Sequence, residues 1–310
     1  MPSSSNTFNS STKQSPIALA IITAIAGLNA QPTFAFGDGA MCTPENTLTV
    51  TSDLGDTSVG TLAAAIILAN ADSNCSQIEF ASAVTSINLD ATIDITENLN
   101  IVGHGKNDLT ISNTSGVAIN ATSGDLHVSH LTVSNSSTGI RQQSGDLTVD
   151  DVLIDKNGKG ILAQGVHDMV VRNTAITNST NDGGLQFINN SSTSSLLIDT
   201  SDISNNQTTG SSGGLFVDID AATDIKITNS TLSKNESGGI YIHASNKTSI
   251  SIEGSSIDDN NNRSSGGGVF VANSSSDLEF EIGLLNTSDA AKEYGGLAAG
   301  CLSHIEKKTG

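Results

Sequence analysis

Three stretches of this chain repeat one pattern: a glycine pair, a short apolar strand, a polar gap, a second strand and a turn rich in serine and asparagine. They begin at Gly213 (GGLFVDIDAATDIKITNSTLSKNES), Gly238 (GGIYIHASNKTSISIEGSSIDDNN) and Gly267 (GGVFVANSSSDLEFEIGLLNTSD). Looser copies precede them, so that seven units can be aligned, and an eighth that begins at Gly295 is not completed. Periods of 21 to 30 residues indicate a solenoid.

Each unit has three apolar positions. The first set opens the first strand and consists of Val117, Ile140, Ile161, Leu185, Leu215, Ile240 and Val269. The second set opens the second strand and consists of Leu126, Leu147, Met169, Leu196, Ile225, Ile250 and Leu278. The third set follows the second by seven residues in every unit and consists of Val133, Ile154, Ile176, Ile203, Leu232, Ile257 and Leu285. The other two spacings vary from unit to unit.

A constant spacing between variable ones is what stacked coils require, because side chains that lie on their counterparts cannot shift register while loops can lengthen. The apolar residues alternate with period two, as in Ile225/Ile227 and Ile250/Ile252, and the repeats show no helical periodicity. The sequence therefore predicts an all-β fold, a right-handed single-stranded parallel β-helix with one thin continuous core.

Asparagine and glycine occupy the predicted corners of the coils. Asn157, Asn206, Asn235 and Asn260 each lie three residues after the third apolar position. Stacked asparagines can share amide hydrogen bonds between coils and tolerate a bent backbone, so we predict a structural ladder. A glycine precedes each first strand and provides either positive φ or close approach.

A different segment precedes the repeats. Leu48–Val50 and Ile78–Phe80 are predicted strands, and Thr61–Ala71 is a predicted short helix with an apolar face. A helix here would cover the open end of the core, as a terminal coil requires.

This segment resembles a known family. TVTSDLGDTSVGTLAAAIILANADSNCSQIEF, from Thr49, and ITENLNIVGHGKNDLTIS, from Ile95, are similar to the N-terminal region of bacterial secreted and outer-surface β-helix proteins. The GGLF, GGIY and GGVF units are similar to the repeats of polymorphic outer-membrane proteins, within the pectate-lyase-like superfamily. The resemblance covers residues 42–297 and implies a surface or adhesin-like role. It departs from the family pattern at Ala63, where an arginine is usual.

The first 35 residues are predicted to be a signal peptide. Lys13 is their only charge, the apolar run Ile17–Leu28 is too short to span a bilayer, and Thr33-Phe34-Ala35 offers a cleavage site. A buried helix or a membrane anchor is the alternative. We expect a cap with the first coils at 36–115, repeats at 116–294, and an incomplete coil and tail at 295–310. Secretion or a bacterial cell-surface location follows from the signal, without a transmembrane span in the mature chain.

The net charge limits which partners the chain can bind, and the cysteine content suggests a disulfide. Without residues 1–35 the chain has 12 basic and 32 acidic side chains, a net charge of −20. That charge disfavours nucleic acid and anionic membranes, and it fits loose binding of Ca²⁺. An exported chain can keep a disulfide, and we expect Cys42–Cys75 with Cys301 free, lipidation of Cys42 being the alternative.

Polysaccharide lyases and hydrolases also use β-helices, and fold alone does not decide activity. Asp150-Asp151 and Asp258-Asp259 are paired acids too far apart to act together. The arginines, Arg172 among them, are expected to form no column with the aspartates. His127, His130 and His167 occur singly, without metal-ligand spacing. No catalytic residue and no cofactor are therefore predicted, and polysaccharide lyase or glycoside hydrolase remains the alternative function.

One outer face offers a binding site. Phe216, Tyr241 and Phe270 follow the first inward residue of their units and are expected to stack on one face, with Asp218 and His243 two residues further on. Such a strip suits a glycan, because sugar rings pack on aromatic faces; packing under loops is the alternative. We expect a non-catalytic surface protein that binds polysaccharide or a host or cell surface. A truncated remnant of a larger surface protein is a further alternative.

Overall fold

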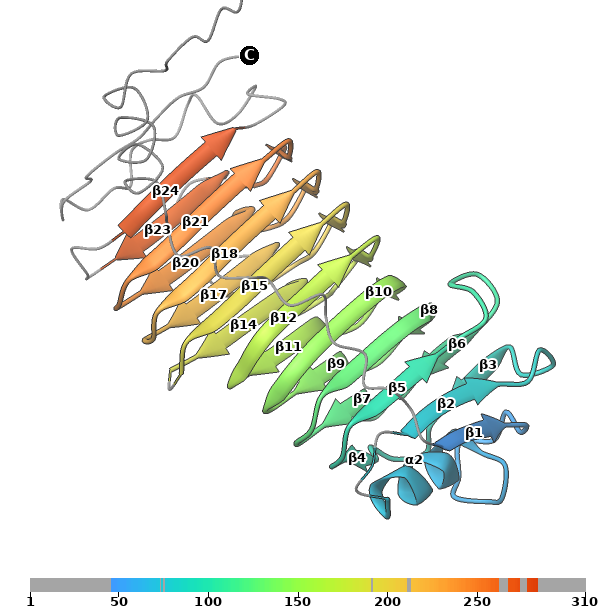
Figure 1. Ribbon diagram of the computed structural model, residues 1–310. Coiled ribbons are helices and arrows are strands. Elements are labelled where there is room, and N and C mark those ends of the chain that lie inside the picture. Colours follow the sequence, from blue (N-terminus) through green and yellow to red (C-terminus); the bar gives the residue numbers. More distant parts are fainter. Residues whose placement is uncertain are drawn as a thin grey trace, which may run out of the picture. The chain divides into compact units, whose positions relative to one another are not determined.

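Residues 46–283 are described by the computed structural model, except 73, 75, 191, 211–212, 262–266 and 274–277. Every pairing between its named strands is parallel. Strands from successive repeats lie side by side, so that the chain winds in coils (Figure 1). The predicted parallel β-solenoid is therefore confirmed.

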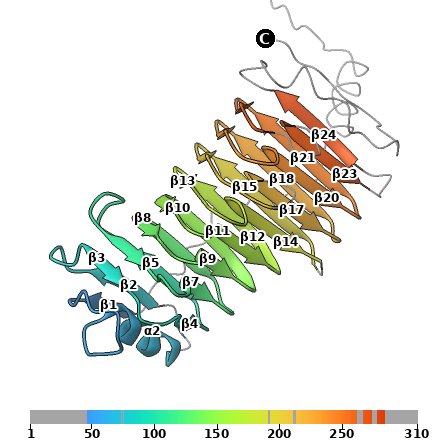
Figure 2. The same ribbon diagram turned by 180° about the vertical axis from the view of Figure 1, so that it is seen from behind.

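Three faces make up each coil. The first face contains β4 (Asp94–Ile95), β7 (Val117–Ala121), β9 (Thr138–Gln142), β11 (Lys159–Gln164), β14 (Leu185–Asn189), β17 (Leu215–Ile219), β20 (Ile240–Ala244) and β23 (Val269–Asn273). The second face contains β1 (Asn46–Val50), β2 (Ser76–Phe80), β5 (Leu99–Val102), the first parts of β8 (Leu126–Ser134) and β10 (Gly145–Asp155), β12 (Val166–Arg172), β15 (Ser194–Asp199), β18 (Thr223–Thr228), β21 (Thr248–Glu253) and β24 (Leu278–Gly283). The view from behind shows the same stack of strands (Figure 2).

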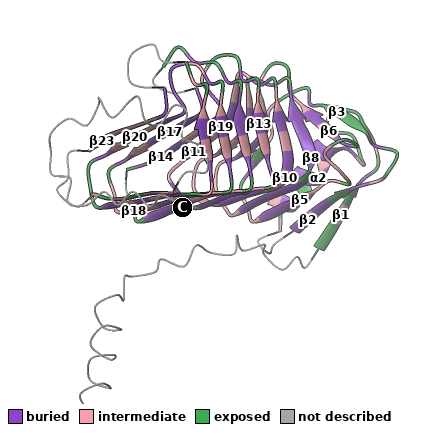
Figure 3. Cartoon of the chain, turned by 90° about the horizontal axis from the view of Figure 1, so that it is seen from above, coloured by how far each residue is buried: buried purple, intermediate pink, exposed green. Residues whose placement is uncertain are grey.

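The third face is made of shorter strands. It contains β3 (Ser86–Asn88), β6 (Thr110–Ser112), the last parts of β8 and β10, β13 (Ala175–Thr177), β16 (Asp202–Ser204), β19 (Thr231–Ser233) and β22 (Ser256–Asp258). Buried residues follow the strands, and many exposed residues lie at the turns (Figure 3).

The core consists of rows of aliphatic side chains, and each coil contributes one side chain to a row. Val149, Val171, Ile198, Ile227 and Ile252 form one such row, and none of these side chains is exposed to solvent. Strands in a parallel sheet lie about 4.8 Å apart, so these side chains rest directly on one another. The constant step of seven residues keeps the second and third rows in register from Leu126 and Val133 to Ile250 and Ile257.

Two corners of each coil fix this step. The corner between the second and third faces has a residue with positive φ at His130, Asp151, Asn173, Thr200, Asn229 and Gly254. The corner after the third face has one at Asn135, Lys156, Asn178, Asn205, Lys234 and Asp259. A single residue with left-handed backbone conformation turns the chain sharply, and here it recurs at the same place in successive coils. Asparagine and aspartate adopt this conformation more easily than most other residues.

The prediction of register is wrong in two units. Ile119, not Val117, lies opposite Ile140, and Val117 pairs with Thr138. At the other end Phe280, not Leu278, lies opposite Ile250. Both errors are shifts of two residues. A strand has a side-chain period of two, so such a shift keeps every side chain on the same side, and alternation alone cannot detect it.

Helix α2 (Leu62–Asn70) lies at the N-terminal end of the coils, against β1, β2 and β4 (Figure 1). Thr61 caps it by accepting a hydrogen bond from the Ala64 N–H at 3.2 Å. Leu62, Ala65 and Ile66 are buried against the first coil, whereas the helix leaves Ile67 and Leu68 exposed. The helix therefore covers the end of the core.

Candidate functional site

The three aromatic residues predicted for one outer face form a single column on the first face. Phe216 on β17 pairs in register with Tyr241 on β20, which pairs with Phe270 on β23. The ring centroids are 5.6 Å apart for Phe216 and Tyr241 and 5.1 Å apart for Tyr241 and Phe270, with planes 11° and 17° from parallel. All three side chains are half-buried. We name these three residues the aromatic ridge.

Each ring of the aromatic ridge covers only part of its neighbour. Carbon atoms in contact lie about 3.5–4.0 Å apart. Nearly parallel rings with centroids 5.1–5.6 Å apart are therefore displaced sideways, which is the offset arrangement that aromatic pairs prefer. The displacement leaves ring edges and a strip of ring face at the surface, and it removes the rest of each face from any ligand.

Asp218 and His243 form the next outward column beside the aromatic ridge. They lie in register on β17 and β20, and His243 Nδ1 is 2.8 Å from Asp218 Oδ1. Their side chains are 37% and 44% exposed. The structure thus brings together all five residues predicted for this face, with the polar pair two residues along the strands from the rings.

Among the described strands of the first face, aromatic residues occupy three coils of the ridge column. The same position is Gln186 on β14, Leu162 on β11 and Arg141 on β9. Lys159 Nζ donates to Gln186 Oε1 at 3.0 Å and lies 3.5 Å from Asp182 Oδ2. A polar, ion-paired group therefore borders the ridge on its N-terminal side.

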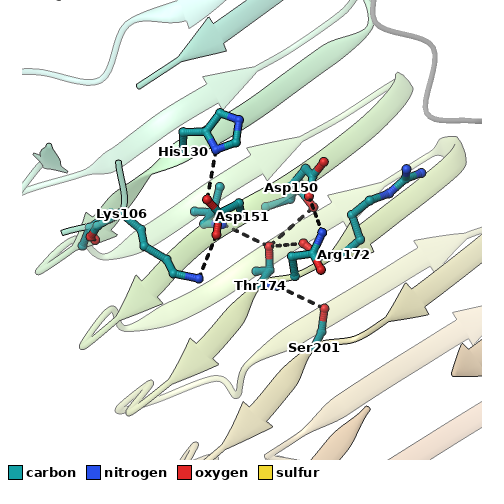
Figure 4. Close-up of polar contacts among 11 residues, drawn as sticks. Lys106, His130, Asp150, Asp151, Arg172, Thr174 and Ser201 are labelled. Carbon is teal, nitrogen blue, oxygen red and sulfur yellow. Dashed lines mark hydrogen bonds and ion pairs between the residues drawn. The ribbon is translucent and has the colours of Figure 1, made fainter. Parts of the chain in front are cut away.

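A second group of polar side chains lies at the corner between the second and third faces. Lys106 and His130 both point at Asp151 (Figure 4), with Lys106 Nζ 2.8 Å from one carboxylate oxygen and His130 Nδ1 3.0 Å from the other. Lys106 comes from the loop between β5 and β6, which the Thr132 hydroxyl anchors by donating to the Lys106 carbonyl. We name Lys106, His130 and Asp151 the corner cluster.

The corner cluster fixes the protonation of Asp151. Hydrogen bonds from Lys106 and then His130 lower the pKa of Asp151 below its usual value. An ionised carboxylate accepts only, so Nδ1 of His130 is the donor in this contact. The side chains of Lys106, His130 and Asp151 are 41%, 51% and 35% exposed, so water reaches all three. The expectation that His130 occurs singly is wrong.

Arg172 corrects a second expectation about charges. It lies in register with Asp150 on one neighbouring strand and Asp199 on the other, so an arginine does form a column with aspartates. Asn173 Nδ2 donates to Asp150 Oδ1 at 3.0 Å. Asp150, Asp151 and Arg172 lie close together around this corner (Figure 4). This column could not be found from the spacing of the residues in the sequence, because the number of residues per coil varies.

Comparison with known proteins gives the fold family. A family model described as a right-handed beta helix region matches residues 107–282, more than half of the chain. The chain belongs to the right-handed β-helix family. No curated protein matches this β-helix.

The asparagines predicted as a ladder line the inside of a corner of the β-helix. Asn206 donates from its backbone N–H and from Nδ2 to Asn235 Oδ1, each at 3.0 Å. Nδ2 of Asn157 donates to the Val133 carbonyl at 3.0 Å. Two coils carry serine instead, and the Ser136 and Ser179 N–H groups donate to Asn157 and Asn206. The side-chain oxygens thus satisfy backbone donors one coil away.

The glycines before the first strands make room for this ladder. A Cβ on Gly184 would come within 2.8 Å of Asn206 Nδ2, and one on Gly239 within 2.8 Å of Asn260 Nδ2. Neither glycine has a positive φ. Close approach, not backbone conformation, is therefore the reason for glycine at these two positions.

A second ladder was missed from the sequence. At the corner between the second and third faces, buried hydroxyls accept backbone hydrogen bonds from the preceding coil: Val152 to Thr174 (3.3 Å), Thr174 to Ser201 (3.3 Å), Ser201 to Ser230 (3.1 Å) and Ser230 to Ser255 (3.1 Å). Each of these hydroxyl residues lies three positions after an inward residue of the second face. That fixed offset was the signal in the sequence.

Acidic residues form a column at the start of the second-face strands. The Asp146 N–H donates to Asp125 Oδ1 at 3.0 Å and the Asp168 N–H to Asp146 Oδ1 at 3.1 Å. Burial raises the pKa of Asp146; the hydrogen bond from Asp168 opposes the rise, and the charges of Asp125 and Asp168 add to it. Burial likewise raises the pKa of Asp224. The carboxylates of Asp125 and Asp146 thus each accept a hydrogen bond from the backbone of the next coil.

Some predictions lie outside the described residues. These are the signal peptide (1–35), the disulfide Cys42–Cys75, Cys301, and the tail (295–310). Within the described part of the chain, no cluster of three or more His, Cys, Asp or Glu side chains could hold a metal ion. Among those same residues no helix has the length and apolar character to cross a bilayer.

Proposed function

We propose that this β-helix is an exported protein of the bacterial surface or extracellular space that binds glycans along the aromatic ridge without catalysing a reaction. The observation that carries the proposal is the register of Phe216, Tyr241 and Phe270, which places three half-buried rings on consecutive coils. Sugar C–H groups pack against aromatic surface, and a ridge along the coil axis matches the extended form of a glycan chain.

Polar groups beside the ridge complete the proposed site. The Tyr241 hydroxyl, the Asp218 carboxylate and the His243 imidazole offer donors and acceptors to sugar hydroxyls. The offset stacking exposes only strips of each ring, so each contact contributes little. We therefore expect weak binding, with dissociation constants of about 1 mM for short oligosaccharides.

A triple substitution tests the ridge. Phe216→Ala, Tyr241→Ala and Phe270→Ala together should abolish binding to those glycans of a polysaccharide array that the unaltered protein binds. Leu162→Ala is the matched control, because Leu162 occupies the same outward position on β11 and lies outside the ridge. Unchanged array binding by the triple variant, with an unchanged circular dichroism spectrum, would remove the proposal.

Tyr241→Phe separates the ring from its hydroxyl. The variant keeps a ring between Phe216 and Phe270, so the packing of the ridge should survive. Glycan affinity should fall by about five-fold if the hydroxyl donates to the ligand, since a neutral hydrogen bond contributes about 1 kcal/mol. Equal affinity would assign recognition to the ring surfaces alone.

Export is the second part of the proposal. Lys13 and the apolar run Ile17–Leu28 support a signal peptide. Expression in a bacterial host should yield a mature protein outside the cytoplasm that begins at Phe36, which N-terminal sequencing would read directly. Recovery of the uncut chain from the cytoplasm alone would contradict export. Loose binding of Ca²⁺ stays a prediction, which calorimetric titration of the mature protein would test.

The corner cluster supports a second candidate function, cleavage of an acidic polysaccharide. Asp151 orients His130 as carboxylates orient histidine bases, and Lys106 places a cation beside it on a neighbouring coil. A lyase would use His130 Nε2 to take a proton from the sugar carbon next to the carboxylate, with a cation beside the developing charge. The glycosidic C–O bond then breaks as a C=C double bond forms, and the leaving oxygen takes a proton from water.

Product release separates the two candidates. An active β-helix should form unsaturated ends or reducing ends from acidic polysaccharide, and His130→Gln should abolish this while His167→Gln, in β12 and exposed, should not. The exposed position of the corner cluster is the reason why we place this candidate second, because proton transfer gains most where water is excluded.

A further inference from the structure

The polar pair beside the aromatic ridge joins a carboxylate to an imidazole, a side chain that can carry either no charge or one positive charge. His243 and Asp218 lie one coil apart, joined by the 2.8 Å contact between Nδ1 and Oδ1. Imidazole side chains commonly gain a proton between about pH 8 and pH 5. The pair therefore changes from a net charge of −1 to zero as His243 becomes protonated, while both side chains stay partly exposed to a ligand.

Few other charges face this pair. His243 pairs with Asp218 of β17 and with Ala272 of β23, and the described residues of β23 include no titratable side chain. On β20 itself the other titratable residue is Tyr241. In the described turns next to these strands the charged residues are Asp220, Lys234, Lys247 and Asp259, all exposed, and Glu236, which is half-buried. Among the described residues in register with His243 on the two neighbouring strands, Asp218 is thus the charged one.

We propose that the Asp218–His243 pair makes the aromatic ridge discriminate against anionic glycans at neutral pH, and that protonation of His243 removes this discrimination. The inference rests on the proposed glycan binding at the ridge and adds the ligand class and its control. At neutral pH a ligand carboxylate beside the ridge meets the uncompensated charge of Asp218. At lower pH it meets an imidazolium with a free N–H at Nε2, which donates a charge-assisted hydrogen bond.

Matched ligands measure the effect. Cellohexaose and its glucuronate counterpart share one linkage and differ in charge, and sugar carboxylates remain ionised at both pH 5.5 and pH 7.5. Titration calorimetry of the full chain should show the ratio of anionic to neutral affinity rising about three- to tenfold from pH 7.5 to pH 5.5, the size of one charge at a solvated site. Affinity for cellohexaose itself should stay nearly constant.

Substitutions assign the effect to the pair. His243→Gln should lower the affinity for cellohexaose and for the anionic hexasaccharide by the same factor, so that the ratio of the two affinities no longer depends on pH. Asp218→Asn should raise affinity for the anionic hexasaccharide at pH 7.5. His167→Gln is the control, because His167 is exposed on β12 of the second face, and it should respond to pH as the unaltered protein does. Unfolding curves at both pH values check that the variants fold.

The outcomes distinguish this inference from the proposed function. Equal ratios at both pH values, or a pH dependence that persists in His243→Gln, would overturn the role of the pair while leaving glycan binding at the ridge intact. Binding of neither hexasaccharide at either pH would overturn this inference, and absence of binding to every glycan of the polysaccharide array would overturn the proposed function with it. A rising ratio that vanishes only in His243→Gln would support both.

Discussion

Asn235 donates to Asn260 twice, from its backbone N–H and from its side-chain Nδ2, both at 3.0 Å from the same Oδ1. Asn206 makes the same pair of hydrogen bonds to Asn235. The side chain of Asn235 is fully buried, so water cannot replace any of these partners. The ladder therefore links neighbouring coils through buried polar groups that cannot form hydrogen bonds with water instead.

Asn235→Ala should lower the free energy of unfolding by about 2–4 kcal/mol, because it leaves buried donors of Asn206 without an acceptor. Denaturant unfolding followed by circular dichroism measures this. Asn190→Ala is the control: Asn190 is exposed after β14, and its loss should change stability by less than about 0.5 kcal/mol. Similar effects of the two substitutions would contradict the structural role of the ladder.

Thr174→Val should cost about 1–3 kcal/mol, because the two side chains have nearly the same shape and only the hydroxyl is lost. The Val152 N–H would lose its acceptor in a buried corner. Thermal unfolding of this variant beside Thr180→Val, at an exposed position, gives the comparison. No difference between them would show that the hydroxyl column does not stabilise the coils.

Gly239→Ala should destabilise the protein by about 1–3 kcal/mol through overpacking. Its new Cβ would lie 2.8 Å from Asn260 Nδ2 and 2.9 Å from Ile257 Cγ2. Gly268→Ala is a matched control one coil further on, because a Cβ there meets nothing within 4 Å. Chemical unfolding of both variants checks the prediction, which equal stabilities would refute.

Stability should pass through a maximum in weakly acidic solution. Burial raises the pKa of Asp146 and that of Asp224 in the folded state. Ionisation of these carboxyl groups therefore destabilises the fold at neutral pH, and the lost stability returns as pH falls through their folded-state pKa values. Burial also raises the pKa of Asp155, but hydrogen bonds from Asn178, Lys156 and Thr177 prevail and lower this pKa below its usual value. The stability it contributes is present above the unfolded-state value of 3.8 and is lost as pH falls through the folded value.

Unfolding free energies between pH 7.5 and pH 3 test this profile. Asp146→Asn should be more stable than the unaltered protein at pH 7.5, since the amide can still accept from the Asp168 N–H, and the difference should close as pH falls. Asp155→Asn should show the reverse, with a loss at neutral pH that fades below about pH 4. A profile that is flat for both variants would contradict the assigned pKa directions.

The sequence was sufficient for the coil because the coil is a repeated local pattern. Alternation at Ile225/Ile227 and the step of seven residues depend only on neighbours along the chain, and both reappear as stacked rows. The same alternation misplaced Val117 and Leu278, because a shift of two residues preserves which side each residue faces.

The two candidate sites also differ in how far the sequence predicts them. The column of Phe216, Tyr241 and Phe270 could be predicted, because each ring has the same place in its own repeat. The corner cluster could not, because Lys106 belongs to a loop outside the repeat pattern and reaches Asp151, 45 residues further along the chain.

Sequence alone thus determined the winding of this protein, its apolar rows, and the face that carries the rings. Only the tertiary structure decided which charges meet and how the rings stack. The physical reason is range: strand alternation and turn chemistry act over a few residues, whereas contacts between coils join residues 18 or more positions apart. The lengths of the intervening loops set those contacts, and no local preference encodes them.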